Sequence, residues 1–424
     1  MKGLKMNNLQ SIFYKQQKVL KKIMKTFISV VFLSVGWIQA NDLVIINATI
    51  YSATDRGVIN HASIVINDGV ITEIQQTIDD KKILNAVSVI DAKGQIVTPG
   101  FIGVMNQLGL VEVNSELNTQ DGSDKNLGIS FDPSLAYNSN STLIPLARQG
   151  GVTGNISSPR ISTSLFAGQS FYVNLSTDDN NIEQTKNAVV VRLGRQKNAS
   201  RAHNIQLLQT KLANAKNLKA SKYSQEQQVL SDVLAKKKPL LIYANRASDL
   251  LKIIELKKQF DIKVIIVGAG DAVRVKNQLA DAKIPLIIKP INNLPSNFDT
   301  LHQSIYDAGI LSKAGIKLIF RGVSGHYLEQ TRYNAGNAVA NGMEYQQAIE
   351  AISANVADIF SLNTGRIEVG SSADLVLWKG DPLDLNSRVQ HMWIKGKHIE
   401  NHTRQDSLRK RYQEQSDMPA AYVN

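Results

Sequence analysis

Between Pro99 and Ser353 the chain alternates short, β-branched apolar runs with helical stretches. This alternation is typical of βα units, in which successive strands lie parallel in one sheet. Eight such runs within about 255 residues predict an eight-stranded (β/α)8 barrel of the TIM type. The expected strands are 96–104, 151–156, 171–175, 188–193, 239–245, 263–267, 285–289 and 317–320. The expected helices include one long helix over 200–234, then 247–260, 271–282, 301–314 and 344–353.

Both flanks of this central region have a β texture. Residues 43–97 form short apolar runs, and Asn67-Asp68-Gly69 between two of them predicts a tight hairpin. Residues 365–382 and 389–401 have the same texture. The few strands of the C-terminal flank cannot form a closed sheet alone, so they need the N-terminal strands as partners. We therefore expect a composite β-sandwich domain from 41–98 and 360–402, beside a barrel over 99–359. Residues 403–424 are charged and poor in apolar side chains, which predicts a surface helix or disorder.

The first 40 residues have the three parts of a secretory signal peptide. The segment carries seven lysines and no acidic residue, an apolar run at 26–38, and Ala40 at a suitable cleavage position. The run is shorter than the about 20 residues that span a membrane, so we expect cleavage near Ala40 and a periplasmic or secreted protein without a stable anchor. Ile38 is large for its place before the cut, which leaves an uncleaved anchor as the alternative. The start codon also stays open between Met1, Met6 and Met24.

The formal net charge is +12, and the chain contains no cysteine. Because seven lysines lie in the leader, the remaining charge does not indicate a nucleic-acid partner. Lys236 to Lys238 form the densest remaining basic run, which we interpret as the solvated end of a helix. Without cysteine, neither disulfides nor thiolate metal sites nor a cysteine nucleophile can form.

Three blocks carry a family resemblance: 97–109 (VTPGFIGVMNQLG), 131–170, and 353–384 (SANVADIFSLNTGRIEVGSSADLVLWKGDPLD). With 239–256 and 331–343 they resemble imidazolonepropionase-like members of the amidohydrolase superfamily over nearly all of residues 42–400. The resemblance implies metal-dependent hydrolysis of carbon–nitrogen bonds in peptide-like or cyclic amides. It also implies one or two divalent metals such as zinc at the carboxyl-terminal mouth of the barrel, and association through barrel surfaces.

The chain departs from this family at the expected metal ligands. Met105 and Gln107 stand where the first strand of the family carries two histidines, and Gly103 replaces the preceding aspartate. A thioether suits copper(I), and a neutral amide is a weak partner for zinc. Two later histidine positions and the strand-eight aspartate position are also changed: they carry Tyr243, Gly268, and Arg321 followed by Gly322. We therefore expect no metal cofactor.

Other polar groups are expected near the barrel mouth: Asp249, Asp271, Arg321 and His326. Instead of a role at the mouth, Asp271 could cap a helix, and His326 could form a hydrogen bond to the backbone. Three hypotheses stay open. The chain is a non-catalytic homologue that binds a small-molecule ligand or pairs with itself or an active relative; or a hydrolase built around His326 and carboxylates; or a binding module whose mouth holds an anion beside Met105, Gln107, Tyr243 and Arg321.

Overall fold

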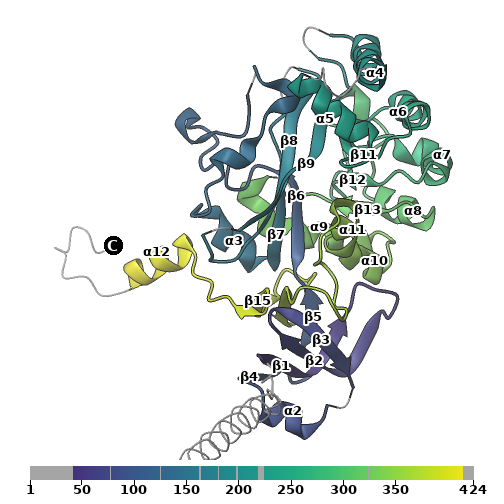
Figure 1. The fold of residues 1–424 in the computed structure, drawn as a ribbon. Coiled ribbons are helices and arrows are strands. Elements are labelled where there is room, and N and C mark those ends of the chain that lie inside the picture. The colour runs from purple at the N-terminus through teal and green to yellow at the C-terminus, as the bar shows by residue number, and fades with distance from the viewer. Residues whose placement is uncertain are drawn as a thin grey trace, which may run out of the picture. The chain divides into compact units, whose positions relative to one another are not determined.

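The computed structural model describes residues 42–413 except 77, 125, 162–163, 180, 197–198, 218–223 and 323. The proposed leader therefore lies outside the described residues. The described chain forms one compact unit that contains two eight-stranded sheets (Figure 1). Among these residues, no helix combines the length and the apolar character needed to cross a membrane.

One sheet is a nearly closed barrel whose strands follow the order β13-β12-β11-β10-β9-β8-β7-β6. The strands are β6 (Phe101–Asn106), β7 (Val152–Ser157), β8 (Phe166–Asn174), β9 (Ile182–Arg192), β10 (Leu240–Ala244), β11 (Val264–Gly268), β12 (Leu286–Ile288) and β13 (Leu318–Phe320). Each strand overlaps one of the eight runs expected from the sequence, but residues 96–99 of the first run form a strand of the other sheet. The barrel fold is confirmed.

The expectation of eight parallel strands is wrong for β8, which pairs antiparallel with both β7 and β9. The remaining neighbours in the barrel are parallel. The links 158–165 and 175–181 are each shorter than the dozen or so residues that a parallel crossover requires. Links of this length therefore join β7, β8 and β9 as a meander.

Helices cover the outside of the barrel (Figure 1). They are α3 (Leu143–Gln149), α4 (Arg201–Asn217), α5 (Gln225–Leu234), α6 (Ala247–Phe260), α7 (Lys276–Asp281), α8 (Asp307–Lys313), α9 (Thr331–Ala340), α10 (Tyr345–Glu350) and α11 (Ala354–Phe360). The single long helix expected over 200–234 is wrong. A new helix, α5, begins after Ser224, which forms a capping box with Gln227.

Alternate residues of the barrel strands face two different layers. On β10, Leu240 and Ile242 pack with helix residues such as Leu250 in the outer core. Leu241, between them, packs with Ile265 of β11 and other strand residues in a separate cluster. This period of two, typical of strands, identifies the second cluster as the barrel interior.

The other sheet joins strands from both flanks in the order β16-β15-β14-β5-β1-β2-β3, with β4 also paired to β1. Its strands are β1 (Leu43–Tyr51), β2 (Val58–Asn67), β3 (Val70–Gln75), β4 (Ser88–Asp91), β5 (Ile96–Pro99), β14 (Leu375–Lys379), β15 (Arg388–Ile394) and β16 (Lys397–His398). The strands form one sheet, not the two sheets of a sandwich. Asp68 and Gly69, with φ of 49° and 74°, make the expected β2–β3 hairpin turn.

Trp378 of β14 packs at the junction of the two sheets. Its ring lies 5.6 Å from that of Phe101 on β6, and its indole N–H donates to Thr98 Oγ1 at 2.9 Å. Gly151 passes the same ring with φ of 79°, and a Cβ at this position would lie 2.4 Å from Trp378 Cζ2. The indole therefore fixes the small sheet against the barrel at a point where only glycine fits.

Arg332 of α9 holds the loop between β14 and β15. Only 2% of the residue is exposed, yet its guanidinium pairs with no carboxylate among the described ion pairs. Instead it donates to the carbonyl oxygens of Pro382, Asp384 and Ser387 at 2.8, 2.5 and 3.0 Å. Arg332 thus ties the loop after β14 to the barrel.

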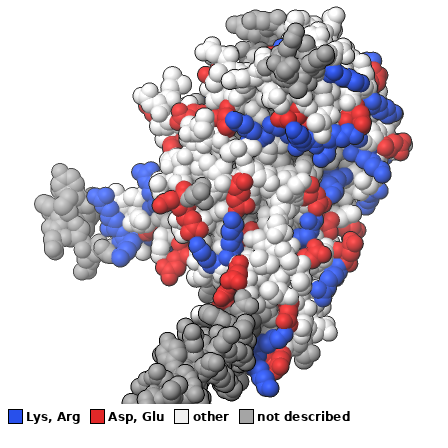
Figure 2. Space-filling model, viewed as in Figure 1, with Lys and Arg blue, Asp and Glu red and all other residues white. Residues whose placement is uncertain are grey.

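The charged surface is mixed in sign. Acidic and basic side chains are interspersed on the face shown in Figure 2. The run Lys236 to Lys238 is paired: Lys236 contacts Asp261 at 2.7 Å, and the next two lysines contact Asp232.

The charged C-terminal segment expected as a surface helix or disorder contains α12 (Arg404–Gln413), a polar helix with no buried residue. Residues after 413 lie outside the described part.

Candidate functional site

Four side chains occupy inward positions at or just after the carboxyl ends of four barrel strands. The inward positions of β9, β10, β12 and β13 carry the interior residues Val190, Leu241, Ile287 and Ile319. The next inward positions, two residues later, carry the residues that we call the mouth cluster: Arg192, Tyr243, Lys289 and Arg321. Arg192 and Tyr243 are direct neighbours in the β9–β10 ladder. The functional end of such barrels is this carboxyl-terminal end.

Arg321 lies over the ring of Tyr243, with its guanidinium carbon 5.8 Å from the ring centroid. Burial raises the pKa of the Tyr243 hydroxyl, and Arg321 opposes part of this rise. The phenol therefore stays protonated at neutral pH and can donate a hydrogen bond. The Nε of Arg321 is buried and has no hydrogen-bond partner among the described residues.

Lys289 follows β12 and is half-buried beside Arg321. Burial lowers the pKa of its amine, and the positive charge of Arg321 lowers it further. In the described part of the chain, no acidic group shifts the pKa of Lys289 or Tyr243. The described ion pairs also include none with Lys289 or Arg321. This side of the mouth therefore has an uncompensated positive charge.

The side chains at the end of β6 are uncharged. Met105 has a φ of 56°, which breaks the alternation of β6 and leaves Ile102, Val104 and Met105 all in the interior cluster. Its sulfur accepts a hydrogen bond from Ser158 Oγ at 3.4 Å, and the Gln107 amide donates to the Ser158 carbonyl, also at 3.4 Å. Both family histidine positions are thus occupied by side chains that bond to the end of β7.

An amide network continues this neutral side. Asn106 donates to Asn155 Oδ1 at 2.7 Å and accepts from the backbone N–H of Leu108 at 2.9 Å. Asn155 also donates to Ser157 Oγ at 2.8 Å. A side chain at Gly103 has no space, because its Cβ would lie 2.3 Å from Asn155 Oδ1.

Two further altered positions are glycines in confined space. Gly268, at the end of β11, has a φ of 99°, and its Cβ would lie 2.5 Å from Asn245 Oδ1. Gly322 follows β13, and its Cβ would lie 3.2 Å from Thr331 Oγ1. A histidine at 268 would therefore require both a strained backbone and movement of Asn245.

The two candidate carboxylates have partners outside the mouth cluster. Asp249 is 6% exposed and lies 3.3 Å from Arg201 Nε, in a network that includes Asp299. Asp271 accepts from the backbone N–H of Ala247 at 3.1 Å and lies 2.9 Å from His302 Nδ1. Asp271 therefore caps the start of α6, and not the helical segment that follows it.

His326, in the 3₁₀ helix η7 (Gly325–Gln330), bonds to backbone. Its Nε2 lies 2.9 Å from the carbonyl oxygen of Glu112, so this nitrogen carries the proton and donates. Throughout the described ranges, no three histidine, aspartate or glutamate side chains lie together as metal ligands would. The structure brings Arg321 over Tyr243 and places Lys289 near Arg321, whereas His326, Asp249 and Asp271 bond elsewhere.

Asp307 at the start of α8 gives a pH-dependent prediction. Burial raises its pKa to about 6, although its carboxyl accepts the Ser304 N–H at 2.9 Å. Because the folded pKa lies above the unfolded value of about 4, the contribution to stability is full below pH 4 and is lost as the pH rises through 6. We expect the free energy of unfolding of Asp307→Asn to decrease by about 1–2 kcal/mol less than that of wild type over this pH range.

Urea unfolding of wild type and Asp307→Asn at pH 4 to 7 measures the difference. The variant should become the more stable of the two as the pH rises, while the exposed control Asp55→Asn should follow wild type. Parallel curves for wild type and Asp307→Asn would contradict the assignment.

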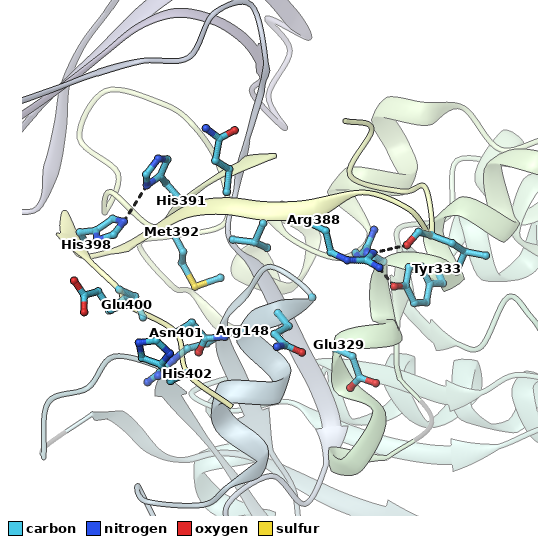
Figure 3. A pocket seen from close by; sticks show the side chains of 17 residues that line it. Arg148, Glu329, Tyr333, Arg388, His391, Met392, His398, Glu400, Asn401 and His402 are labelled. Carbon is cyan, nitrogen blue, oxygen red and sulfur yellow. Dashed lines mark hydrogen bonds between the residues drawn. The ribbon is translucent and has the colours of Figure 1, made fainter. Parts of the chain in front are cut away.

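A cleft of about 830 Å³ lies away from the mouth cluster, between β15 and β16 on one side and α3, η7 and α9 on the other (Figure 3). Its wall includes His391 and His398, whose Nδ1 and Nε2 lie 3.1 Å apart. The sequence spacing of these histidines gave no sign of a pair, because their contact depends on the register of β15 and β16. Arg148, also in the wall, donates to the carbonyl oxygens of Leu175 and Ser176.

Comparison with known proteins identifies the family. Residues 173–399, more than half of the chain, match the amidohydrolase family. An amidohydrolase from Thermotoga maritima has 22% identity and a TM-score of 0.77, with 85% of this chain and 100% of that chain covered.

Two further structures are the ochratoxinase of A. niger (16% identity, TM-score 0.55, 85% and 96% covered) and a prolidase (15%, 0.54, 85% and 100%). At these identities the likeness shows the fold alone. No curated protein sequence matches the chain. On the family match and the shared barrel architecture, the chain is a member of the amidohydrolase family.

Proposed function

We propose that this amidohydrolase-family protein is a non-catalytic, ligand-binding homologue that has lost the metal site of its family. The observation that carries the proposal is the mouth cluster, where Arg192, Tyr243, Lys289 and Arg321 occupy inward positions at the strand ends. In an active relative this end of the barrel binds the metal and the substrate. Basic side chains and a phenol at these positions favour binding without hydrolysis.

The residues at the mouth do not fit a divalent cation. Hard or borderline divalent ions need neutral imidazoles and carboxylates, whereas Met105 offers a thioether and Gln107 an amide already bonded to the β7 end. Lys289 and Arg321 would also repel a cation across a poorly solvated space. We therefore derive no catalytic step through a metal.

The rival is a hydrolase that holds one metal with His326 and nearby carboxylates. His326 Nε2 is already engaged by a backbone carbonyl, and Asp249 and Asp271 are engaged by Arg201 and the α6 backbone. Recruiting them would require all three side chains to leave their partners. The geometry therefore favours the non-catalytic proposal.

Two further parts of the proposal concern the cell. The chain is exported and processed near Ala40, and it associates either with itself or with an active relative, not with nucleic acid. Fractionation of cells that express the full chain tests export. Co-purification with a histidine-bearing relative tests the partnership, and a lone monomer in native mass spectrometry would contradict it.

Restoring the histidines gives a direct prediction. The triple variant Met105→His, Gln107→His, Tyr243→His should remain inactive, because the strand-eight position carries Arg321-Gly322 and Gly268 has no space for a histidine. Elemental analysis and assay of wild type and triple variant on a panel of amides provide the measurements. We expect neither stoichiometric zinc nor turnover from either protein.

Wild-type protein that retains one equivalent of zinc after purification, and loses zinc and turnover together in His326→Ala, would support the rival hydrolase.

A further inference from the structure

The ends of β12 and β13 place two like charges side by side. Lys289 and Arg321 occupy equivalent inward positions on these neighbouring strands, and the backbone N–H of Arg321 donates to Ile288 at 3.1 Å. Both side chains are half-buried, and neither has a carboxylate partner among the described ion pairs. Burial of two unpaired cations is unfavourable unless an anion joins them.

We propose that the mouth cluster binds a small molecule through an oxyanion group, a carboxylate or a phosphate, held between Lys289 and Arg321. The inference rests on the proposed function and names the chemical class of its ligand. Tyr243 lies beside Arg321 and supplies a hydroxyl donor, and Arg192 is the ladder neighbour of Tyr243 on β9.

The available donors suit an oxyanion better than a halide or a neutral group. A guanidinium presents a planar set of N–H donors that matches two oxygens of one carboxylate or phosphate, and the Nε of Arg321 is buried without a partner. The Lys289 ammonium adds a point charge. Because burial favours the protonated phenol of Tyr243, this side chain donates without competing for the anion.

The neutral side of the mouth orients the remainder of the ligand. The polar atoms of Met105, Gln107, Asn106 and Asn155 bond largely to one another or to β7. They therefore offer uncharged side chains next to the cations, because β6 and β13 are the two strands at which the nearly closed barrel ends meet. An anionic head toward β12–β13 and a neutral body toward β6–β7 is the arrangement that these charges favour.

Calorimetric titration of EDTA-treated, full-length protein with phosphate or succinate at constant ionic strength tests the proposal. Wild type should bind at least one of the two anions saturably and gain thermal stability. Lys289→Met should bind it about tenfold more weakly or worse, because one charge of the pair is gone. Lys258→Met, which removes one exposed cation of α6, is the matched control and should bind like wild type.

Stability without an anion provides a second readout. Lys289→Met should then be more stable than wild type, because methionine fills a similar volume and removes the like-charge contact. A merely structural lysine would give the opposite sign. No saturable binding in wild type, equal binding in Lys289→Met, or a less stable anion-free Lys289→Met would each overturn the proposal.

The phosphate and succinate arms separate the two sources of the oxyanion. Failure here is distinguishable from failure of the proposed function, since bound zinc and amide turnover are measured separately. A protein without zinc or turnover that also ignores both anions would retain the non-catalytic assignment and lose only the ligand class.

Discussion

Replacing Arg332 with methionine is expected to destabilise the folded protein by about 3–5 kcal/mol. The substitution keeps most of the apolar stem but leaves the carbonyls of Pro382, Asp384 and Ser387 without their shared donor. It also removes the guanidinium from the Tyr333 ring, at 4.3 Å, and the Trp378 ring, at 5.4 Å. The loop after β14 should lose its attachment to α9.

Arg388→Met is the matched control for this prediction. Arg388 also donates to two carbonyls of the same loop, those of Leu385 and Ser387, but it is exposed to water. Water can replace its bonds, so we expect a cost of about 1 kcal/mol or less. Urea unfolding followed by circular dichroism measures both variants. Equal losses would mean that burial of Arg332 adds nothing to its role.

The second large effect is expected from Gly151→Ala. The new methyl group must adopt a left-handed conformation at φ 79° and would lie 2.4 Å from Trp378 Cζ2. Gly315→Ala is a control with nearly the same φ, 77°, and no atom within 4 Å of the new Cβ. We expect the control to cost about 1 kcal/mol from backbone strain, and Gly151→Ala to cost about 3 kcal/mol or more.

A double-mutant cycle isolates the clash from the strain. Trp378→Phe removes the Cζ2 and Cη2 atoms that the new methyl group would meet. In that background Gly151→Ala should cost about as much as Gly315→Ala. The same full penalty in both backgrounds would show that the indole yields easily, and that the interaction described between the two sheets is weak.

The sequence predicted the strands of the barrel well, because each is a buried apolar run with clear boundaries. It did not predict the direction of β8, although the short links 158–165 and 175–181 carry that information. It also merged α4 and α5, although Ser224 and Gln227 form a recognisable capping box. These errors came from weighing apolar periodicity above the shorter signals of links and caps.

The candidate site was less predictable. Tyr243 and Arg321 were expected at the mouth, but Arg192 and Lys289 were missed, although both lie two residues after an inward apolar residue. Extending the two-residue alternation of each strand to its carboxyl end would have identified both residues. The bulge at Met105 could not be read this way, since its φ of 56° depends on packing at the ends of β6 and β7.

The small sheet has a consequence for the order in which the chain acquires structure. β5 pairs with β1 on one edge, and on the other with β14, where Trp378 bonds to Thr98 across 280 residues. During synthesis the second edge of β5 has no partner until the whole barrel has been made. Such a long-range pairing is slow to form and leaves an open strand edge exposed meanwhile. Chains truncated before β14 would therefore expose an unpaired edge of β5 that can pair with other chains. Pairing with β14 protects the N-terminal strands from such aggregation.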